Sequence, residues 1–447
     1  MMSSTIAAIA TPYGKGAISI IRISGNDAIT LSSNLFNKSN LTSLKPNQMI
    51  HTQLVENDTI VDDIMVTIYK APKSYTGEDM VEIFCHGGIQ VTHNVLNAVL
   101  RQNIELAKPG EFTERAYLNQ KLDLIQAESV MDLINAENDL QIKLAQTGLQ
   151  SIISKKIHIF REKIMSWITH IEVNIDYPEY ESENEITQAF LMPQLIEFIH
   201  EINVSLKESN KNKWIVNGLK TAIIGKPNVG KSSLLNALIK EEKAIVTDIP
   251  GTTRDVIEGY ININGIKLHL LDTAGIRHSE DTIERIGIEK SKQVIEKAEL
   301  IIFVVDQSQP IDEEEKVLLA SISHKPHLVV GNKNDISDNQ SGIDLISLSA
   351  KSSINIHLLE DGIKKLFELG DLDSKNLEFL SNERQIKLLE KCHQHLNQAM
   401  SSTINNLPID MIQLDLRDAW EALSDITGQR YHESLVDDMF RRFCLGK

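Results

Sequence analysis

The sequence is short of cysteine, of long apolar runs and of positive charge. Its three cysteines, Cys85, Cys392 and Cys444, cannot all pair and none lies in a CxxC motif, which predicts free thiols in a reducing compartment. The longest purely apolar run, Leu300–Val305, has six residues, whereas a bilayer span needs about 20. The segment Met1–Ala10 lacks the basic and apolar parts of a secretory signal. These absences predict a cytoplasmic protein with no membrane contact.

Acidic residues outnumber basic ones by 62 to 45, which gives a formal net charge of −17. This excess excludes a broad cationic surface for nucleic acid, although a local basic site stays possible. Hydrophobic residues make up 42% and charged residues 24%, ordinary values for a globular protein with apolar cores. With 447 residues and about 150 residues per domain, the length predicts about three domains.

Residues 1–120 mix strand and helix patterns, which predicts an α+β domain. The candidate strands are Ala17–Ile23, Ile64–Tyr69 and Met80–His86, and the candidate helices are Asp27–Phe36 and Ile89–Gln102. Strands and helices in that order suit a small sheet with helices packed on one face. Glycines in the loops of this region stand beside charged residues, and loops of this kind commonly carry a functional site.

Residues 121–217 and 373–447 have helical patterns and flank a stretch of alternating strands and helices, residues 218–372. We therefore expect a multidomain chain in which an α/β domain with a mainly parallel sheet is inserted into an all-α domain that is split in sequence. The candidate strands of the insert are Leu219–Ile224, Val256–Ile263, Ile266–Leu271, Leu300–Val305, His327–Val330 and Asp344–Leu348, with a hairpin turn at Asn264-Gly265. The run Glu172–Glu185 holds six acids and no base, and a solvated loop is preferred there over a metal site.

A complete phosphate-binding loop, GxxxxGK[ST], runs from Gly225 to Ser232 between a candidate strand and a candidate helix. Glycines let backbone N–H groups converge on phosphates, and the helix N-terminus adds positive potential. We expect Lys231 to neutralise the β- and γ-phosphates and Ser232 to ligate Mg²⁺. The alternative is a chance match in a turn, which the strand-loop-helix context disfavours.

Four further segments follow in the order of a GTPase. Asp272-Thr273-Ala274-Gly275 would place a carboxylate near Mg²⁺ and an amide near the γ-phosphate. Thr252 and Thr253 offer hydroxyls to the metal from a loop that can close on the γ-phosphate. Asn332-Lys333-Asn334-Asp335 supplies a carboxylate for the N1–H and 2-amino donors of guanine, which adenine lacks. Ser349-Ala350-Lys351 would brace the base, and the five segments together predict GTP binding and hydrolysis.

One common catalytic group is missing from these segments. Many GTPases place glutamine directly after Gly275 to orient the attacking water, but this sequence has Ile276, which cannot bond to water. Another group has to position the water, and an extra positive charge has to come from elsewhere. Asn228 offers a side-chain oxygen that suits a hard cation; alternatively, it only stabilises the turn of the phosphate-binding loop.

Segments outside these motifs resemble the MnmE family, also called TrmE, of bacterial tRNA-modification GTPases over essentially the whole chain. They are Ala10–Gly16, Ile21–Gly25, Tyr75–Asp79, His86–Gly88, Lys108–Phe112 with Arg115-Ala116, Asn119–Asp123, Ile245–Asp248, Glu284–Ile288 and Phe443–Lys447. The resemblance implies an N-terminal domain that binds folate and forms a homodimer, a split helical domain, and an inserted Ras-like G domain.

The resemblance also implies the ligands of the site. Hydrolysis would depend on K⁺ in the place of an arginine finger, with the ligands Asn228, Thr247, Ile249 and Thr252. The Mg²⁺ ligands map onto Ser232 and Thr253. Contacts to 5,10-methylene- or 5-formyl-tetrahydrofolate map onto Arg22, Glu82, Lys121 and Lys447. A pterin presents paired donors like those of guanine, which a carboxylate accepts, and Arg and Lys suit the carboxylates of folate.

Three residues form the expected catalytic set: Lys231, Glu284 and Cys444. The resemblance makes Glu284 the group that orients water, whereas the residue alone would suggest an exposed acid at a helix start. Cys444 has Arg441 and Arg442 nearby in sequence, which would favour a thiolate, but a small apolar filler is an equal alternative.

The motifs and the resemblance together assign contacts with GTP to a larger set of residues. These are Asn228, Val229, Gly230, Lys231, Ser232, Ser233, Thr247, Asp248, Ile249, Pro250, Gly251, Thr252, Thr253, Asp272, Thr273, Ala274, Gly275, Asn332, Lys333, Asn334, Asp335, Ser349, Ala350 and Lys351.

By resemblance, we expect a GTPase that acts with an FAD-dependent partner in a heterotetramer. The pair would add an aminomethyl or carboxymethylaminomethyl group to C5 of the wobble uridine of tRNA, with a one-carbon unit from folate. Because tRNA is a polyanion and this chain carries −17, we expect the partner to hold most of the tRNA-binding surface. Two rivals are a ribosome-assembly GTPase, which has no place for the folate-domain segments, and a nucleotide-dependent switch without a role in modification.

Overall fold

The structure is a computed structural model that describes residues 4–36, 41–176, 189–241, 259–263, 266–271, 294–336, 343–367, 377–430, 439–441, 443 and 446. The chain divides into two compact units. Unit 1 comprises Met1–Met131, Gly148–Glu162 and Leu423–Lys447, and unit 2 comprises Asp132–Thr147 and Lys163–Ala422. The domain limits expected from the sequence stay predictions.

Unit 1 contains a six-stranded sheet in the order β3-β4-β5-β2-β1-β6, which is antiparallel except between β1 and β6. Its strands are β1 (Ile6–Ile9), β2 (Ile18–Ser24), β3 (Met49–Glu56), β4 (Thr59–Tyr69), β5 (Met80–His86) and β6 (Glu105–Leu106). Its shorter helices are α1 (Ala28–Ser33), α2 (Ile89–Leu100), α3 (Glu111–Leu118) and α4 (Leu124–Ile134), with a 3₁₀ turn at Leu41–Ser43.

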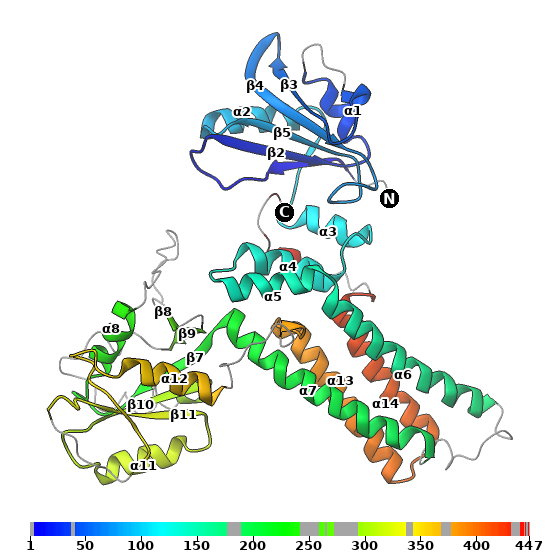
Figure 1. Cartoon of the computed structure of the whole chain (residues 1–447). Helices are drawn as coiled ribbons and strands as arrows, with labels where there is room; N and C mark the ends of the chain where they lie inside the picture. Colours follow the sequence, from blue (N-terminus) through cyan, green and yellow to red (C-terminus); the bar gives the residue numbers. More distant parts are fainter. Residues whose placement is uncertain are drawn as a thin grey trace. The chain divides into compact units, whose positions relative to one another are not determined.

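Helices α1 and α2 cover one face of this sheet (Figure 1), as the sequence predicted. Side chains alternate between the two faces of a strand, so Ile21 and Ile23 of β2 join Ile83 of β5 in the apolar core under the helices. Arg22 and Glu82 stand opposite each other on the same two strands and therefore share the other face. The fold thus leaves a charged pair on the sheet face away from α1 and α2.

Unit 2 contains a second six-stranded sheet, in the order β12-β11-β10-β7-β9-β8. Every neighbouring pair is parallel except β8 and β9, which confirms the predicted mainly parallel sheet. Its strands are β7 (Leu219–Ile224), β8 (Gly259–Ile263), β9 (Ile266–Leu270), β10 (Leu300–Asp306), β11 (His327–Asn332) and β12 (Ile346–Ser347). The expected turn at Asn264-Gly265 lies outside the described residues, between the two antiparallel strands.

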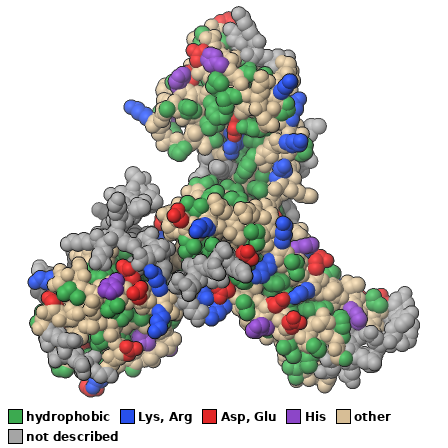
Figure 2. Space-filling view, in the orientation of Figure 1, with side chains coloured by type: hydrophobic (Ala, Val, Ile, Leu, Met, Phe, Trp, Pro, Cys, Tyr) green, Lys and Arg blue, Asp and Glu red, His purple; other side chains and the backbone are tan. Residues whose placement is uncertain are grey.

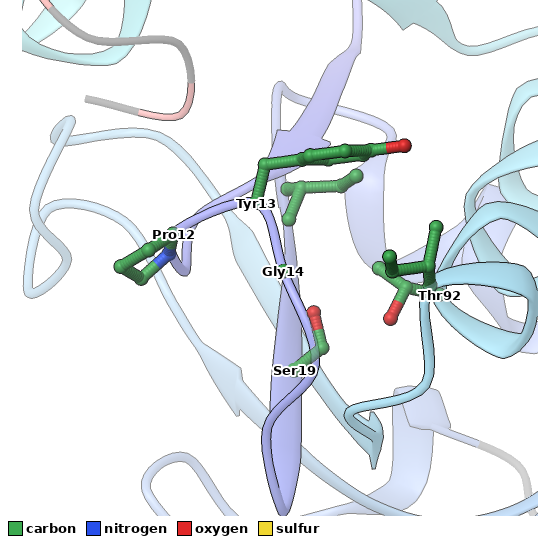
Figure 3. A pocket seen from close by; sticks show the side chains of 7 residues that line it. Pro12, Tyr13, Gly14, Ser19 and Thr92 are labelled. Carbon is green, nitrogen blue, oxygen red and sulfur yellow. The ribbon is translucent and has the colours of Figure 1, made fainter. Parts of the chain in front are cut away.

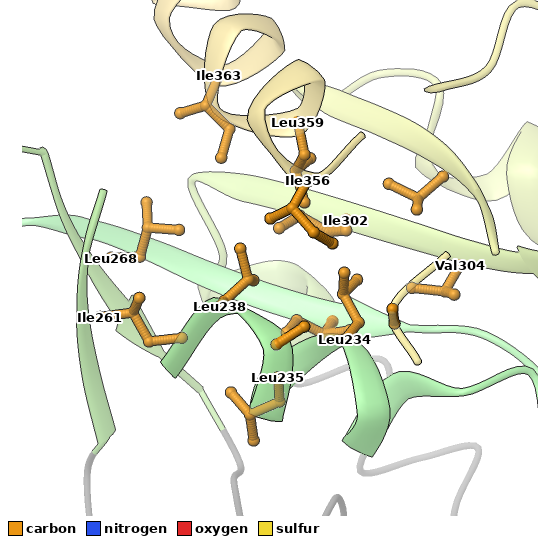
Figure 4. Packing of buried hydrophobic residues seen from close by; sticks show 14 of the residues in the cluster. Leu234, Leu235, Leu238, Ile261, Leu268, Ile302, Val304, Ile356, Leu359 and Ile363 are labelled. Atoms are coloured by element: carbon orange, nitrogen blue, oxygen red, sulfur yellow. The ribbon is translucent and has the colours of Figure 1, made fainter. Parts of the chain in front are cut away.

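Helices cover both faces of the second sheet, as expected for a buried parallel sheet. On one face, Ile302 and Val304 of β10 pack with residues of α8 (Lys231–Glu241) and α12 (Ile356–Leu366), as Figure 4 shows. On the other face, Ile301 and Phe303 pack with Ile322 of α11 (Glu313–Ile322). This double burial explains why β10 reads as an unbroken apolar run.

The remaining helices are α5 (Asp139–Leu149), α6 (Ile152–Asp176), α7 (Met192–Asn217), α13 (Glu383–Ile404) and α14 (Ile409–Thr427). Within unit 2, α7 and α13 lie side by side (Figure 1), and Trp167 of α6 meets the ring edge of Phe198 of α7 at a centroid distance of 5.4 Å. Helix α6 includes Glu172 and Asp176, so the first part of the run that was expected to be a loop is helical. Most of the expected acidic loop, residues 177–185, lies outside the described part of the chain. None of the described helices is long and apolar enough to cross a membrane.

Candidate functional site

The phosphate-binding loop joins the end of β7 to the start of α8, the context that its sequence requires. Helix α8 begins at Lys231, so the N–H groups of its first turn border the loop and favour an anion. The Lys231 ammonium donates to the carbonyl oxygens of Gly225 and Lys226 at 2.8 and 2.6 Å. Burial lowers the pKa of Lys231 from its usual value. This lysine is therefore held inside the loop, where the sequence placed a phosphate contact.

Asn332 joins three of the predicted GTPase segments. It is only 2% exposed, its Nδ2 donates to the Val229 carbonyl at 2.9 Å, and its Oδ1 accepts from the Ala350 N–H at 3.0 Å. Gly230 lets this side chain approach, because a Cβ there would lie 2.1 Å from Nδ2 of Asn332, and the φ of +97° is one that L residues rarely adopt. The structure thus brings the phosphate-binding loop, the base-recognition segment and the bracing loop together.

Lys333 is fixed by a residue that the sequence analysis did not single out. Its Nζ donates to Oδ2 of Asp306, the last residue of β10, at 2.6 Å. Ser308 donates to Oδ1 of Asp306 from its N–H at 3.0 Å and from its hydroxyl at 2.6 Å. Partial burial works to raise the pKa of Asp306, but the donors from Lys333 and Ser308 outweigh it and hold that pKa below its usual value. Asp335, the predicted guanine contact, follows in the same segment and is exposed.

A second unpredicted contact anchors the outer side of the phosphate-binding loop. The Lys226 ammonium donates to the carboxylate of Asp312 and lies 2.8 Å from that of Glu314. Asp312 is also the N-cap of α11, where it accepts from the Glu315 N–H at 3.0 Å. The hydrogen bond that Lys226 donates to Asp312 is the main reason that the pKa of Lys226 is raised. Spacing along the chain gives no sign of this pair, because 86 residues separate its members.

Several predicted residues of the nucleotide site lie outside the described residues. They are Thr247, Asp248, Ile249, Pro250, Gly251, Thr252, Thr253, Asp272, Thr273, Ala274, Gly275 and Glu284. Asn228 is described: it is exposed and has a φ of +61°, a left-handed conformation that asparagine adopts more readily than most residues. That geometry is compatible with either of its two proposed roles, as a cation ligand or as a turn residue.

A second candidate site lies on the face of the sheet in unit 1 that is turned away from α1 and α2. Arg22 Nε donates to Oε1 of Glu82 at 2.9 Å, and Nη2 lies 2.9 Å from the same oxygen. The Tyr69 hydroxyl donates to Oε2 of Glu82 at 3.1 Å. The side chains of Arg22 and Glu82 are 17% and 13% exposed, so the pair is sheltered but reachable. The structure therefore brings together two of the four predicted folate contacts and adds Tyr69.

Aromatic rings and the end of the chain surround Arg22. Its guanidinium carbon lies 5.5 Å from the ring centroid of Tyr75 and 5.8 Å from that of Phe112, and its Nη1 donates to the Gly446 carbonyl at 3.3 Å. Gly446 has a φ of +87°, and a Cβ there would lie 2.2 Å from the Ile9 carbonyl oxygen. Glycine thus lets the end of the chain lie against β1 beside Arg22. Cys444 and Lys447 themselves lie outside the described residues.

Lys121 is connected with this site through the loop between β4 and β5. Its side chain is exposed, and its Nζ donates to the Pro72 carbonyl at 3.0 Å. The same loop carries Tyr75, which lies over Arg22. Lys121, the third predicted folate contact, is therefore hydrogen-bonded to the loop that borders the Arg22–Glu82 pair.

A buried ion pair holds that loop in place. Arg115 of α3 donates to Glu78 at 3.1 Å and to Glu111 at 2.8 Å, and the Ser24 hydroxyl also donates to Glu78 at 2.8 Å. A buried charge left without its partner is costly, so these contacts fix the loop to α3 and β2. Glu78 and Arg115, which carried part of the family resemblance, have a structural role here.

The segment Ala10–Gly16 borders a small hollow (Figure 3). The hollow of about 10 Å³ beside Tyr13 has room for one water at most. A wider cleft of about 480 Å³ has Asp123 in its wall, but this carboxylate already accepts from the Gln126 N–H at 2.9 Å and caps α4. Neither hollow gathers the predicted folate contacts.

Sequence reasoning missed Tyr69, Asp306 and Asp312 as parts of the two sites. Tyr69 ends a strand that the sequence did predict, and Asp306 ends another, so a polar residue at the end of an apolar run was the available signal. Their partners are set by strand register and by loop packing, which the sequence alone does not specify.

Comparison with known proteins covers nearly the whole chain. Residues 5–121 match the family described as GTP-binding protein TrmE N-terminus, and residues 124–444 match the MnmE helical domain. The tRNA modification GTPases MnmE of Bacillus mycoides and Bacillus cytotoxicus are 44% and 43% identical over 458 aligned positions, covering 100% of both chains. That of Bacillus subtilis is 42% identical over 99% of this chain and 100% of its own.

Among solved structures, the FeoB G domain of Methanococcus jannaschii is 24% identical and covers 34% of this chain and 98% of its own, with a TM-score of 0.25. The family assignment accordingly depends on the full-length relatives and the two family models. This chain belongs to the MnmE family of tRNA modification GTPases, enzymes that hydrolyse GTP.

Proposed function

We propose that this GTPase modifies C5 of the wobble uridine of certain tRNAs together with an FAD-dependent partner. The product would carry an aminomethyl or carboxymethylaminomethyl group, and the one-carbon unit would come from tetrahydrofolate. GTP hydrolysis would close and open the G domains of a homodimer rather than supply carbon chemistry. The observation that carries this proposal is the Arg22–Glu82–Tyr69 cluster, a carboxylate site in addition to the one expected to bind guanine.

The residues of the cluster fit a folate. Glu82 offers carboxylate oxygens to the adjacent N–H and amino donors of a pterin. Tyr75 and Phe112 present aromatic rings next to that carboxylate's partner, Arg22. Arg22, Lys121 and Lys447 would bind the carboxylates at the other end of the ligand. When bound, the folate supplies the one-carbon unit, and these side chains hold and orient it.

In the nucleotide site, we assign one role to each residue. Asp335 would accept the guanine donors, Asn332 keeps the three loops in register, and Lys231 would neutralise phosphate oxygens. Ser232, in the first turn of α8, would hold Mg²⁺ together with Thr253. We assign K⁺ to Asn228, Thr247, Ile249 and Thr252, and the positioning of water to Glu284, because Ile276 cannot do this.

The partner would carry most of the tRNA-binding surface in the cytoplasmic complex, a heterotetramer. On the face drawn in Figure 2, basic and acidic side chains of the described residues are interspersed, without one broad basic area. A surface of this kind neutralises few consecutive phosphates, so it suits weak direct contact with tRNA. Cys444, which follows the described Phe443, stays a proposed participant in the modification chemistry.

Mass spectrometry of wobble uridines tests this function in a strain without the protein. Complementation with the parent chain should restore the modified nucleosides, whereas Glu82→Gln and Asp335→Asn should each fail to do so. Asp63→Asn, an exposed carboxylate on β4 of the same sheet, is the matched control and should restore them. Wobble uridines that keep their modification without the protein would overturn the proposal.

A further inference from the structure

The two oxygens of Glu82 are bound by donors of different kinds. Oε1 receives both Nε and Nη2 of the Arg22 guanidinium at 2.9 Å, and Oε2 receives the Tyr69 hydroxyl at 3.1 Å. Strand register explains the meeting: β5 lies between β2 and β4, Arg22 stands directly opposite Glu82, and Tyr69 stands two residues beyond the partner of Glu82 on β4. Diagonal neighbours at this spacing are within reach of an aromatic side chain.

A pterin would need the same oxygens as the guanidinium. Its recognition edge has an N–H beside an amino group, and a guanidinium likewise presents parallel N–H donors to a carboxylate. A two-donor edge needs one lone pair on each oxygen. Arg22 already places two donors on Oε1, so it has to leave that oxygen, whereas the single donor of Tyr69 leaves a lone pair free on Oε2.

We propose that Tyr69 is a positioning residue of the folate site, which holds Glu82 in place while a pterin edge replaces Arg22 on Oε1. This inference rests on the proposed function. The released guanidinium then faces the ligand from beside Tyr75 and Phe112, where it can bind an anionic group. Without the Tyr69 hydroxyl, the departure of Arg22 would leave the Glu82 carboxylate free to rotate.

The surroundings of Tyr69 keep its hydroxyl protonated and therefore able to donate. Burial and the nearby Glu82 carboxylate both raise the pKa of Tyr69 above its usual value. The hydroxyl thus stays a donor throughout the neutral range. Tyr117 of α3 provides a comparison within the same unit, because its hydroxyl donates to the Gly428 carbonyl rather than to Glu82.

Calorimetry of the full-length chain with 5-formyl-tetrahydrofolate tests this role. Tyr69→Phe removes only the hydroxyl and should weaken binding about tenfold, the effect of losing one hydrogen bond to a charged group. Tyr117→Phe, which removes a tyrosine hydroxyl of the same unit outside the site, is the matched control and should stay within about twofold of the parent. Because Tyr69 acts through Glu82, adding Tyr69→Phe to Glu82→Gln should cost no further affinity, a result that a general structural defect would not give.

The possible failures are distinguishable. A parent chain that binds no reduced folate refutes the proposed folate function, and this inference with it. A parent that binds while Tyr69→Phe binds equally well refutes the inference alone. Equal losses in Tyr69→Phe and Tyr117→Phe, or additive losses in the double variant, would also overturn it.

Discussion

Two carboxylates in this chain are proposed to recognise the same kind of molecular edge, and the structure places them in opposite settings. Asp335 is exposed in a loop after β11, close to the buried Asn332 that ties the surrounding loops together. Glu82 lies on the face of a sheet, 13% exposed, and already accepts from Arg22 and Tyr69. Asp335 could therefore accept hydrogen bonds from a ligand directly. Glu82 would first have to lose hydrogen bonds from Arg22, as proposed above.

The difference follows from how each site is built. The nucleotide site gathers loops at the carboxyl ends of parallel strands, and each loop is a contiguous motif. The sheet site takes one residue from each of three antiparallel strands, so its members are 60 and 13 residues apart along the chain. A site built from contiguous loops can be predicted from sequence motifs. A site built from residues on different strands can be identified only when the pairing of the strands is known.

The most disruptive single change is expected at Gly230. Gly230→Ala should weaken GTP binding by on the order of a hundredfold or more, because the new Cβ would lie 2.1 Å from Nδ2 of Asn332 and would also strain the backbone. Binding of 5-formyl-tetrahydrofolate should not change, since Gly230 belongs to the nucleotide site. Fluorescence titration with a labelled GTP analogue measures the first effect and calorimetry the second.

Gly14→Ala is the control for this substitution, because nothing lies within 4 Å of a Cβ at that glycine. It should leave GTP affinity at the parental level. Parental affinity in Gly230→Ala would mean that the contact with Asn332 is not what orders the three loops.

Replacing each carboxylate with its neutral amide should weaken the binding of one ligand and leave the other unchanged. Asp335→Asn should lower GTP affinity by about a hundredfold, since the amide brings a donor against the guanine donors. It should also reduce the preference for GTP over xanthosine triphosphate and leave folate binding alone. Glu82→Gln should do the reverse and weaken folate binding by about a hundredfold at parental GTP affinity. If either variant weakened the binding of both GTP and folate, the two carboxylates would not belong to independent sites.

Much of the fold was predictable from the apolar pattern. The strands β5 and β7 have the predicted bounds, because each is buried and has clear ends. The strands β1, β3 and β6 were not predicted: β6 has two residues and exists only through its pairing with β1. The predicted helix Asp27–Phe36 shortens to α1, because Phe36 instead forms a β-bridge with Leu54. Tertiary pairing outweighed local propensity in these segments.

The sites were predictable to different extents. The phosphate-binding loop, Asn332 and Ala350 meet as their motifs predicted. The contacts of Lys333 with Asp306 and of Lys226 with Asp312 join segments far apart in sequence, and both depend on where loops fold back over the sheet. Arg22 and Glu82 were named by resemblance alone, and the register of β2 and β5 supplies the physical reason for their meeting.

Replacing K⁺ with Na⁺ at equal ionic strength should act on the nucleotide site alone. The GTPase rate should fall about tenfold or more, because the proposed K⁺ supplies charge stabilisation that no identified arginine provides. Folate affinity should stay the same, since the proposed contacts of Arg22 and Lys121 with folate do not involve K⁺. Steady-state phosphate release measures the rate, and an equal rate in the two salts would remove the potassium proposal.

Asp306→Asn should give the smallest effect, because it loosens a support of the nucleotide site without removing a ligand contact. GTP affinity should fall about threefold as Lys333 loses its charged partner, with about 1 kcal/mol of stability lost. Since its pKa is lowered in the folded chain, the carboxylate stabilises fully above its unfolded pKa of about 4, and this contribution is lost as pH falls through the folded value.

The difference in stability between the parent and Asp306→Asn should therefore stay constant from about pH 6 to pH 8, where both pKa values lie below the measured range. Asp344→Asn, an exposed carboxylate of the same unit, is the control and should change neither stability nor affinity. A difference that varied with pH in this range would show that another titrating group controls Lys333. A constant difference would mean that Asp306 stays charged and paired with Lys333 over this range. In contrast to the proposed release of Arg22 from Glu82, this ion pair would stay intact when the ligand binds.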